Sequence, residues 1–364
     1  MYLALLLIVP IILCLMARAV DKRFGIAAFL VAVGACVLLS LGGLAVEFWS
    51  ATSDTEIWNG CIVAKTRDVV SCRHSYDCNC HTDKDGHSHC QTCYEHFYDV
   101  DWNLHFSTGK VVGIPTADRQ GLLEPPRWDA AYVGEPTAET REFTNYLLAA
   151  TDSILLHHDA PEGFSGLVPP YPGEVYDYYR CNRFLLGGAV PVRGEKDWQW
   201  LLDRLNADLG AAKQVNVIVV LAFTDDPRYQ YALEKEWVGG KKNDLIVLIG
   251  TTRYPKISWV RIVSWSTAED LKVVLRDDIQ AIGTLDRRDD IMGAVRKEVQ
   301  GRFERRHMRD LKYLAASHQP GGRALGIILF LECVTVLATA FASANLRGDY
   351  CGGCGHYRSY HRYY

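Results

Sequence analysis

The sequence lacks an excess of charge of either sign. Its 364 residues contain 39 lysines and arginines against 43 aspartates and glutamates, for a net charge of -4. Nucleic-acid-binding domains are usually basic, so the composition excludes that class of partner. The sequence also lacks the GxSxG and HExxH motifs and a complete phosphate-binding loop. These absences favour a binding or assembly protein over an enzyme.

Charge is almost absent from three long apolar stretches. Residues 2–20 carry only Arg18, residues 24–46 carry no charge, and residues 324–344 carry one. About 20 apolar residues suffice to cross a bilayer as a helix, so we expect three transmembrane helices. The first lacks the basic start and the small-residue cleavage site of a signal peptide, which predicts that it is retained.

The short loop ARAVDKR between the first two stretches is basic, and short basic loops remain in the cytoplasm. This rule places residues 47–322 outside the cytoplasm and the tail, residues 345–364, inside. A second group of basic residues lies on the supposed outer side before the third stretch, but long translocated domains largely escape the rule. We expect that group to be solvated or to contact anionic head groups: Arg302, Arg305, Arg306, Arg309 and Lys312.

The soluble region divides by pattern. Residues 57–158 are rich in cysteine, histidine and short β-like runs such as YDVDWNLHF, which predicts a small β-rich domain. The segment REFTNYLLAATDSILLH at its end is expected to be helical. Residues 159–194, with PPYPG and LLGGAVP, are expected to be a long connection.

Residues 196–317 have the pattern of a layered α/β domain. VNVIVVLAF and DLIVLIG read as buried strands, and ISWVRIVSW as a third strand with one wetter face. Asp226 and Pro227 predict a helix start, and Ser266 with Glu269 forms a capping-box pattern. One long helix is expected to run through Met292 and Leu314. The predicted order is α-β-α-β-β-α-α.

Two segments within residues 197–303, VNVIVVLAFTDD and EKEWVGGKKNDLIVLIG, resemble the TPM domain, a membrane-associated α/β module. The resemblance implies a soluble layered α-β-α domain followed by one C-terminal span. It also implies either metal-dependent phosphatase activity or a role in assembling membrane complexes. The cysteine-rich half, with its EPPRW and VGEP turns, resembles membrane proteins of tailed bacteriophages, which implies a bacterial envelope. We expect the protein to lie in the cytoplasmic membrane, with the lipid bilayer and other envelope proteins or a second copy as its partners.

Three carboxylates could support a phosphatase. Asp225 and Asp226 follow the first predicted strand at the end where open α/β sheets bind ligands, and Asp244 lies nearby in sequence. Together they could hold a divalent cation for a phosphohydrolase. The alternative is that Asp226 caps a helix and Asp225 is solvated. GGKKND, ahead of the second strand, reads as a turn because it lacks phosphate-loop spacing.

Two further features concern the third stretch and the tail. Glu332 lies near the middle of the third stretch, where a carboxylate is costly and needs a partner. It is expected either to contact Ser40 or a helix backbone, or to drive self-association. The tail could bind zinc or remain disordered, and its candidate ligands are Cys351, Cys354, His356 and His361.

The densest group of chemically active side chains is SCRHSYDCNCHTDKDGHSHCQTCYEH, residues 71–96. Outside the cytoplasm its thiols favour disulfides, and the candidate cysteines are Cys61, Cys72, Cys78, Cys80, Cys90 and Cys93. The alternative is a zinc sensor, or a site for another divalent cation, whose ligands would be Cys78, Cys80, His81, His87, His89, Cys90 and Cys93. Disulfides combined with a histidine site remain a third possibility.

The DKDG turn predicts that this stretch folds back as a hairpin. A two-residue turn puts Cys78 opposite Cys93, and a three-residue loop puts Cys80 opposite Cys90. The ladder satisfies both registers only if one strand contains a bulge.

Overall fold

The computed structural model describes residues 2–22, 24–150, 152–153, 155–156, 159, 161–164, 166–189 and 192–346. The tail candidates Cys351, Cys354, His356 and His361 lie outside these residues. The chain divides into two compact units. The first, here the helical unit, comprises Met1–Ser53, Thr144–Thr151 and Leu311–Tyr364, and the second, the sheet unit, comprises Asp54–Phe143 and Asp152–Asp310.

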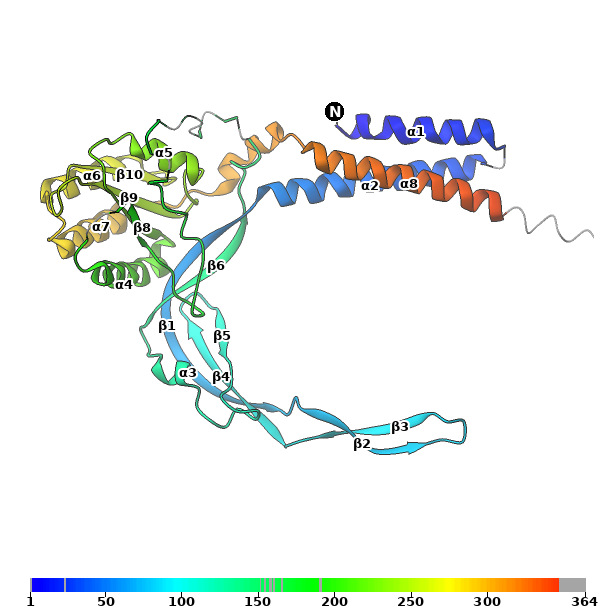
Figure 1. The fold of residues 1–364 in the computed structure, drawn as a ribbon, viewed down its shortest axis with the longest axis horizontal. Coiled ribbons are helices and arrows are strands. Elements are labelled where there is room, and N and C mark those ends of the chain that lie inside the picture. Colours follow the sequence, from blue (N-terminus) through cyan, green and yellow to red (C-terminus); the bar gives the residue numbers. More distant parts are fainter. Residues whose placement is uncertain are drawn as a thin grey trace, which may run out of the picture. The chain divides into compact units, whose positions relative to one another are not determined.

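Three apolar helices form the helical unit: α1 (Tyr2–Val20), α2 (Ile26–Thr52) and α8 (Gly322–Leu346). Each is long and apolar enough to cross a membrane, and they pack side by side in Figure 1. Large apolar side chains on their outer surfaces are exposed, including Leu38, Phe330 and Phe341. Such a surface suits lipid rather than water, so the three helices support a membrane protein.

Small and polar residues line the inside of this bundle. Gly43 on α2 lies so close to Ile328 on α8 that an added Cβ would come within 2.6 Å of it. Ser40 donates a hydrogen bond to Glu332, which is fully buried. The expected contact between Glu332 and Ser40 is therefore present. Small residues and interhelical hydrogen bonds are the usual basis of helix association in lipid.

The sheet unit contains two larger sheets. The first has the strand order β5-β4-β1-β6, formed by β5 (Val111–Ile114), β4 (Tyr98–Phe106), β1 (Ser53–Ser71) and β6 (Pro136–Thr144). Alternate residues of β4 are buried against the short helix α3 (Pro126–Ala130) and neighbouring loops, as the period-2 pattern of a half-buried strand requires. The buried apolar residues of β4 are Val100, Trp102, Leu104 and Phe106.

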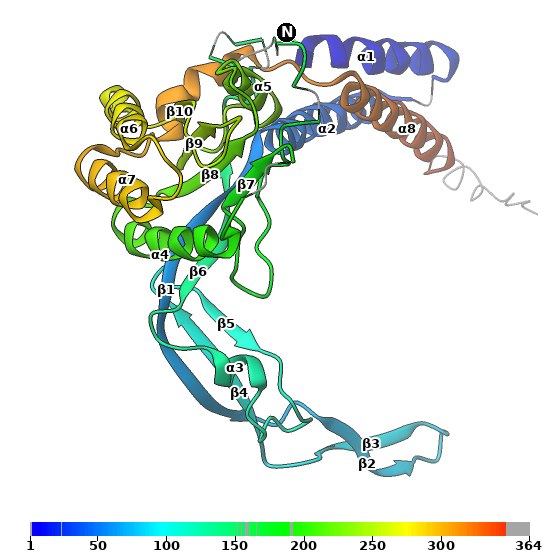
Figure 2. The ribbon, with the colours of Figure 1, turned by 60° about the vertical axis from the view of Figure 1, so that its left-hand side comes forward.

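The second sheet has the order β10-β9-β8-β7, formed by β10 (Trp259–Ser264), β9 (Asp244–Gly250), β8 (Asn216–Ala222) and β7 (Phe184–Gly187). Strands β7, β8 and β9 are parallel, and β10 is antiparallel to β9. Every residue of β8 and β9 is buried because helices cover both faces (Figure 2).

Helices α4 (Glu195–Lys213), α6 (Glu269–Ile282) and α7 (Arg288–Arg302) share one core with the second sheet, and α5 (Tyr229–Glu236) packs in the core on the opposite face. The predicted element order from Lys196 onward and the mixed α/β class are thus confirmed. The stretch expected to be only a connection, residues 159–194, contains the additional strand β7. Its four residues form a parallel pair with β8.

Two helix predictions are wrong. Arg141–Thr144 belongs to β6, and turns follow over residues 146–149, so the segment beginning REFT is not a helix there. Its backbone instead pairs within the first sheet, which overrides local helix propensity. The expected long last helix ends at Arg302, because Phe303 has an extended backbone, and a 3-10 segment follows over Met308–Ser317.

The helix starts also differ from the predicted caps. Helix α5 begins at Tyr229, and Arg228, not Asp226, occupies its N-cap position. The side chain of Asp226 accepts a hydrogen bond from the backbone nitrogen of Arg228, in the turn before the helix. Ser266 donates its hydroxyl to the carbonyl of Glu304 instead of forming the capping box with Glu269. In both cases tertiary or turn contacts take the side chain that the local pattern assigned to a cap.

Three residues of the basic group before α8 make ion pairs or hydrogen bonds within the sheet unit, although the side chain of Arg302 is still 43% exposed. Arg302 pairs with Glu298 and Asp270, and the guanidinium of Arg306 donates to the carbonyl of Trp265. Arg305 pairs with the buried Glu56. Arg309, with a side chain 79% exposed, keeps the predicted solvated state.

Candidate functional site

A two-stranded ribbon, formed by β2 (Ser75–Thr82) and β3 (Ser88–Tyr94), extends from the β1–β4 ladder (Figure 1). We call this ribbon the arm. None of the residues in its two strands is buried, so the arm has no hydrophobic core of its own. An isolated two-stranded hairpin is at best marginally stable in water, so other links must hold it.

Two disulfides link the strands of the arm, Cys78–Cys93 and Cys80–Cys90. The ladder pairs Cys78 with Gln91 and His81 with His89, and the register shifts between these pairs. Asn79 occupies the bulge with φ 49°, a conformation that asparagine tolerates better than most residues. Both predicted cysteine pairs form, but Cys78 lies opposite Gln91 and Cys93 opposite Tyr76. The Cys78–Cys93 disulfide therefore joins diagonal positions instead of the directly opposite ones predicted.

The disulfides decide the roles of the remaining candidates in the arm. Cys61 and Cys72, also candidates for pairing, are free thiols. They are not near each other: Cys61 lies well inside β1, whereas Cys72 follows the end of that strand. Seven residues at the tip were candidate zinc ligands, and the disulfides use the four cysteines among them. The predicted zinc site with thiolate ligands is therefore wrong.

At the tip, histidines remain available. The rings of His81 and His89 stack with centroids 5.5 Å apart, and His89 Nε2 lies 3.1 Å from an oxygen of Asp83. Asp83 also accepts hydrogen bonds from the backbone of Asp85 and His87, which closes the turn. The carboxylate of Asp83 thus stabilises the turn through these hydrogen bonds. His87 is not part of the stacked histidine pair.

A second group of side chains lies at the base of the arm, and the sequence interpretation missed it. Cys72, His74, His96 and Asp99 each offer one ligand atom, and these atoms all lie within 4.8 Å of one another. Cys72 and His74 come from the link between β1 and β2. His96 comes from the link between β3 and β4, and Asp99 is the second residue of β4. We call these four residues the base cluster.

Direct contacts hold the base cluster together. Asp99 contacts His96 and lies 3.4 Å from His74 Nδ1, and the facing nitrogens of the two histidines are 3.3 Å apart. The backbone nitrogen of Arg73 donates to Asp99 at 2.8 Å. Burial raises the pKa of Asp99, but the hydrogen bonds from Arg73 and His96 outweigh it and lower the pKa overall. Asp99 is therefore an ionised, nearly buried carboxylate.

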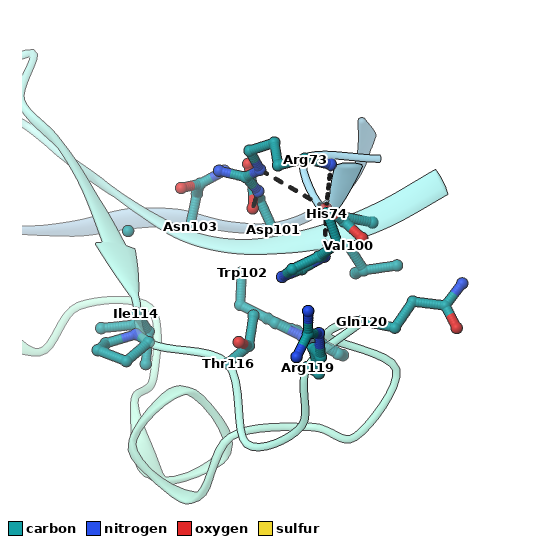
Figure 3. A pocket seen from close by; sticks show the side chains of 13 residues that line it. Arg73, His74, Val100, Asp101, Trp102, Asn103, Ile114, Thr116, Arg119 and Gln120 are labelled. Atoms are coloured by element: carbon teal, nitrogen blue, oxygen red, sulfur yellow. Dashed lines mark hydrogen bonds and ion pairs between the residues drawn. The ribbon is translucent and has the colours of Figure 1, made fainter. Parts of the chain in front are cut away.

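Two cavities meet at the base cluster. One, of about 530 Å³, is lined by His74 and Asp99 together with Arg73, Asp101, Trp102 and Arg119 (Figure 3). The other, of about 580 Å³, is lined by Cys72 and His96 and by the aromatic rings of Tyr94 and Phe97. The cluster can thus be reached by small solutes although Cys72 and Asp99 are buried.

The three carboxylates considered for a phosphatase do not come together. Asp244 pairs in register with Asn216 at the start of β8, whereas Asp225 and Asp226 follow the end of that strand. A strand of seven residues separates the two ends by roughly 20 Å. Asp226 forms an ion pair with Arg228. The structure offers no common cation site for these three residues.

The GGKKND turn is bound to β1. Lys241 pairs with Asp54 at 2.5 Å, Lys242 with Glu56 at 3.3 Å, and the side chain of Asn243 donates to the carbonyl of Ile57. Both lysines already have carboxylate partners within the unit. The turn therefore serves as a contact between the α/β sheet and β1.

Asp244 is completely buried, and this burial raises its pKa to about 6, against opposing hydrogen bonds from Lys241, Asn216 and Tyr171. We predict a pH dependence of stability from this group. Its folded pKa lies above the ordinary 3.8, so the folded state binds the proton more tightly between these values. Its contribution to the free energy of unfolding therefore rises as pH falls from about 6 to about 4, by about 3 kcal/mol.

Urea denaturation of the parent chain and an Asp244→Asn variant at several pH values measures this effect. Subtracting the variant curve removes the contributions of the other carboxylates. A difference curve that is flat between pH 4 and 6 would contradict the raised pKa.

No protein-family model, curated protein or solved structure matches the chain.

Proposed function

We propose that the chain is a multi-pass membrane protein that presents its sheet unit outside the cytoplasm as a binding or assembly module. The observation that carries this proposal is the pair of disulfides in an exposed ribbon. Structural disulfides persist in oxidising compartments and are rare in the cytoplasm. The three apolar helices and the basic loop after the first one support the same orientation.

The arm has the surface of a binding element. Around its base Phe97 is fully exposed, and Tyr94, Tyr76 and Tyr98 are 59%, 50% and 40% exposed. Aromatic side chains are enriched among the residues that contribute most to binding free energy in protein interfaces. A group of them exposed to water therefore indicates an interaction surface. The partner we propose is another protein of the envelope, and self-association is the alternative.

We also propose that residues 197–303 are a TPM-type domain and that the protein belongs to a bacterial cytoplasmic membrane. The support is the sequence resemblance together with the layered arrangement of helices around β8 and β9. Among the roles associated with TPM domains, assembly is favoured over phosphatase activity here, because Asp225 and Asp226 lie at the opposite end of the sheet from Asp244. The zinc-sensor alternative at the tip would have to use histidines alone.

Topology mapping tests the proposal. A compartment-sensitive reporter placed after Gly194 is expected to report the outside, and the same reporter after Tyr364 the cytoplasm. In protein extracted without reductant, Cys61 is expected to react with an alkylating reagent, whereas Cys78, Cys80, Cys90 and Cys93 react only after reduction.

The outcome that contradicts the proposal is a cytoplasmic reading after Gly194 with reduced arm cysteines. A phosphatase assay separates the enzymatic alternative. Turnover of a generic phosphomonoester by the purified chain with divalent metals, abolished by Asp225→Asn, would replace the binding role.

A further inference from the structure

We propose that the base cluster, Cys72, His74, His96 and Asp99, binds a transition-metal ion of the zinc class. The site lies where the arm joins the first sheet and is distinct from the tip histidines.

The donor set is suited to zinc. One thiolate, two imidazoles and one carboxylate are borderline-soft ligands, whereas calcium and magnesium prefer oxygen alone. Zinc bound by four protein side chains is normally tetrahedral, and its bond lengths of about 2.0–2.3 Å put ligand atoms roughly 3.5 Å apart. The ligand atoms all lie within 4.8 Å of one another, which is close to the separation that such an ion requires.

The contacts within the cluster fit a site that a metal would complete. The two histidines face each other through ring nitrogens 3.3 Å apart, and both face Asp99. The same three side chains that contact one another here could bind one ion through these nitrogens and a carboxylate oxygen. The backbone of Arg73 already holds one oxygen of Asp99, as outer-shell hydrogen bonds commonly hold metal-binding carboxylates.

The state of Cys72 is a second, separate observation. Among the described residues of the sheet unit, the free thiols are Cys61, Cys72 and Cys181, and only Cys72 has histidine and carboxylate ligands within reach. A thiol left unpaired beside two disulfides in an oxidising compartment needs an explanation, and metal ligation supplies one. This step, unlike the geometry, assumes the proposed location outside the cytoplasm.

The position of the cluster gives the ion a structural role. The β1–β4 ladder ends at the pair Ser71–Tyr98, and the β2–β3 ladder begins at Ser75–Tyr94. Between them one backbone bond, from Glu95 to His74, joins the strands. A metal bound by residues from both links would fix the arm to the first sheet. Four protein ligands leave no open coordination position, which is typical of structural rather than catalytic zinc.

The test uses the full chain purified in detergent, anaerobically and without chelator or thiol reductant. Because the tail is itself a candidate zinc site, all variants carry Cys351→Ser and Cys354→Ser. We expect stoichiometric zinc in this background by elemental analysis, and background levels after Cys72→Ser, His96→Gln or Asp99→Asn. Cys61→Ser and His87→Ala are matched controls that should retain the metal. Cobalt in place of zinc should show a thiolate charge-transfer band that Cys72→Ser abolishes.

A second measurement keeps the four residues of the base cluster unchanged, so its result does not depend on whether the ligand variants fold. Zinc is expected to slow alkylation of Cys72, followed by peptide mass spectrometry, and to leave Cys61 unaffected. The proposal is overturned if the background protein, reconstituted with zinc, holds only trace metal, if zinc persists in the three ligand variants, or if Cys72 reacts equally fast with and without zinc. The first outcome would indicate a histidine–aspartate hydrogen-bond network. None of these outcomes depends on membrane orientation, which the reporter experiment addresses separately.

Discussion

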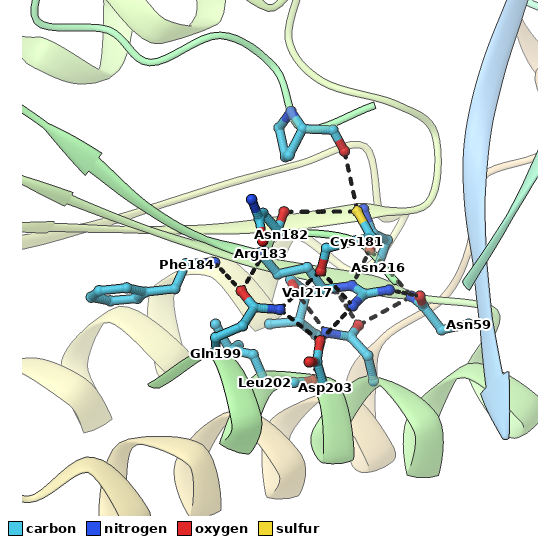
Figure 4. Close-up of polar contacts among 12 residues, drawn as sticks. Asn59, Cys181, Asn182, Arg183, Phe184, Gln199, Leu202, Asp203, Asn216 and Val217 are labelled. Carbon is cyan, nitrogen blue, oxygen red and sulfur yellow. Dashed lines mark hydrogen bonds and ion pairs between the residues drawn. The ribbon is translucent and has the colours of Figure 1, made fainter. Parts of the chain in front are cut away.

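Replacing Arg183 with methionine is expected to lower the free energy of unfolding by about 3 kcal/mol, because one partly buried carboxylate and two buried amide oxygens each lose a donor. The Arg183 side chain is only 3% exposed. Its guanidinium pairs with Asp203 of α4 at 2.8 Å and donates to Asn216, at the start of β8, and to Asn59 of β1 (Figure 4). Methionine fills the space but leaves these three polar side chains short of donors.

The network has a second consequence, because its members come from both sheets of the sheet unit. Asn59 also donates to Asn206 and to the carbonyl of Val215. Strand β1 is thereby attached to α4 and to the start of β8 through buried polar contacts. Among the described residues, the apolar core on the α4 face of the second sheet contains none from β1. Losing Arg183 should therefore loosen the junction between the two sheets as well as lowering stability.

Urea denaturation of the full chain in detergent, followed by tryptophan fluorescence, measures the effect. Arg228→Met is the matched control, since that arginine pairs with Asp226 at an exposed position and its loss should leave the midpoint unchanged. Adding Asp203→Asn to Arg183→Met should recover part of the loss, because it removes the unpaired carboxylate. Equal midpoints for the parent chain and Arg183→Met would refute the role of the network.

Parts of this fold are readable from the sequence because local pattern and burial agree there. VNVIVVLAF and DLIVLIG are continuous apolar runs, and helices cover both faces of the strands they form. β7 could not be read in this way. Its four residues, Phe184–Gly187, follow a turn-rich segment, and their strand conformation depends on pairing with β8. The same dependence on a distant partner made REFT a strand where local propensity favours a helix.

The base cluster could not be predicted from the sequence for a different reason. Its residues stand in the printed sequence as C-x-H before the arm and H-x-x-D after it. Cysteines are densest in the arm, so the sequence predicts its metal candidates there, but the two disulfides use those thiols. Extending the predicted hairpin register back to Ser75 and Tyr94 would have brought Cys72, His74 and His96 together. The signal was therefore present, but it becomes visible only once the arm is treated as a ladder with two ends.

The second large effect concerns the arm itself. Replacing all four arm cysteines with serine is expected to unfold β2 and β3 locally while the rest of the sheet unit remains folded. The strands bury no side chain, so little besides the disulfides opposes the chain entropy of the ribbon. A cross-link that closes a loop of about 15 residues contributes about 3 kcal/mol. The two links span 15 and 10 residues and are nested, so their contributions are not additive.

Hydrogen exchange with mass spectrometry measures this directly. Peptides covering 75–94 should exchange about a hundredfold faster in the serine variant, as about 3 kcal/mol implies, whereas peptides from β8 and β9 should keep their protection. Cys61→Ser is the control for replacing a thiol outside the arm. Restoring the Cys80–Cys90 pair alone should recover most of the protection near the tip, because its register continues through His81 and His89. If arm peptides stay protected without any disulfide, another contact must hold the ribbon, and metal binding at the base cluster would be the first candidate to measure.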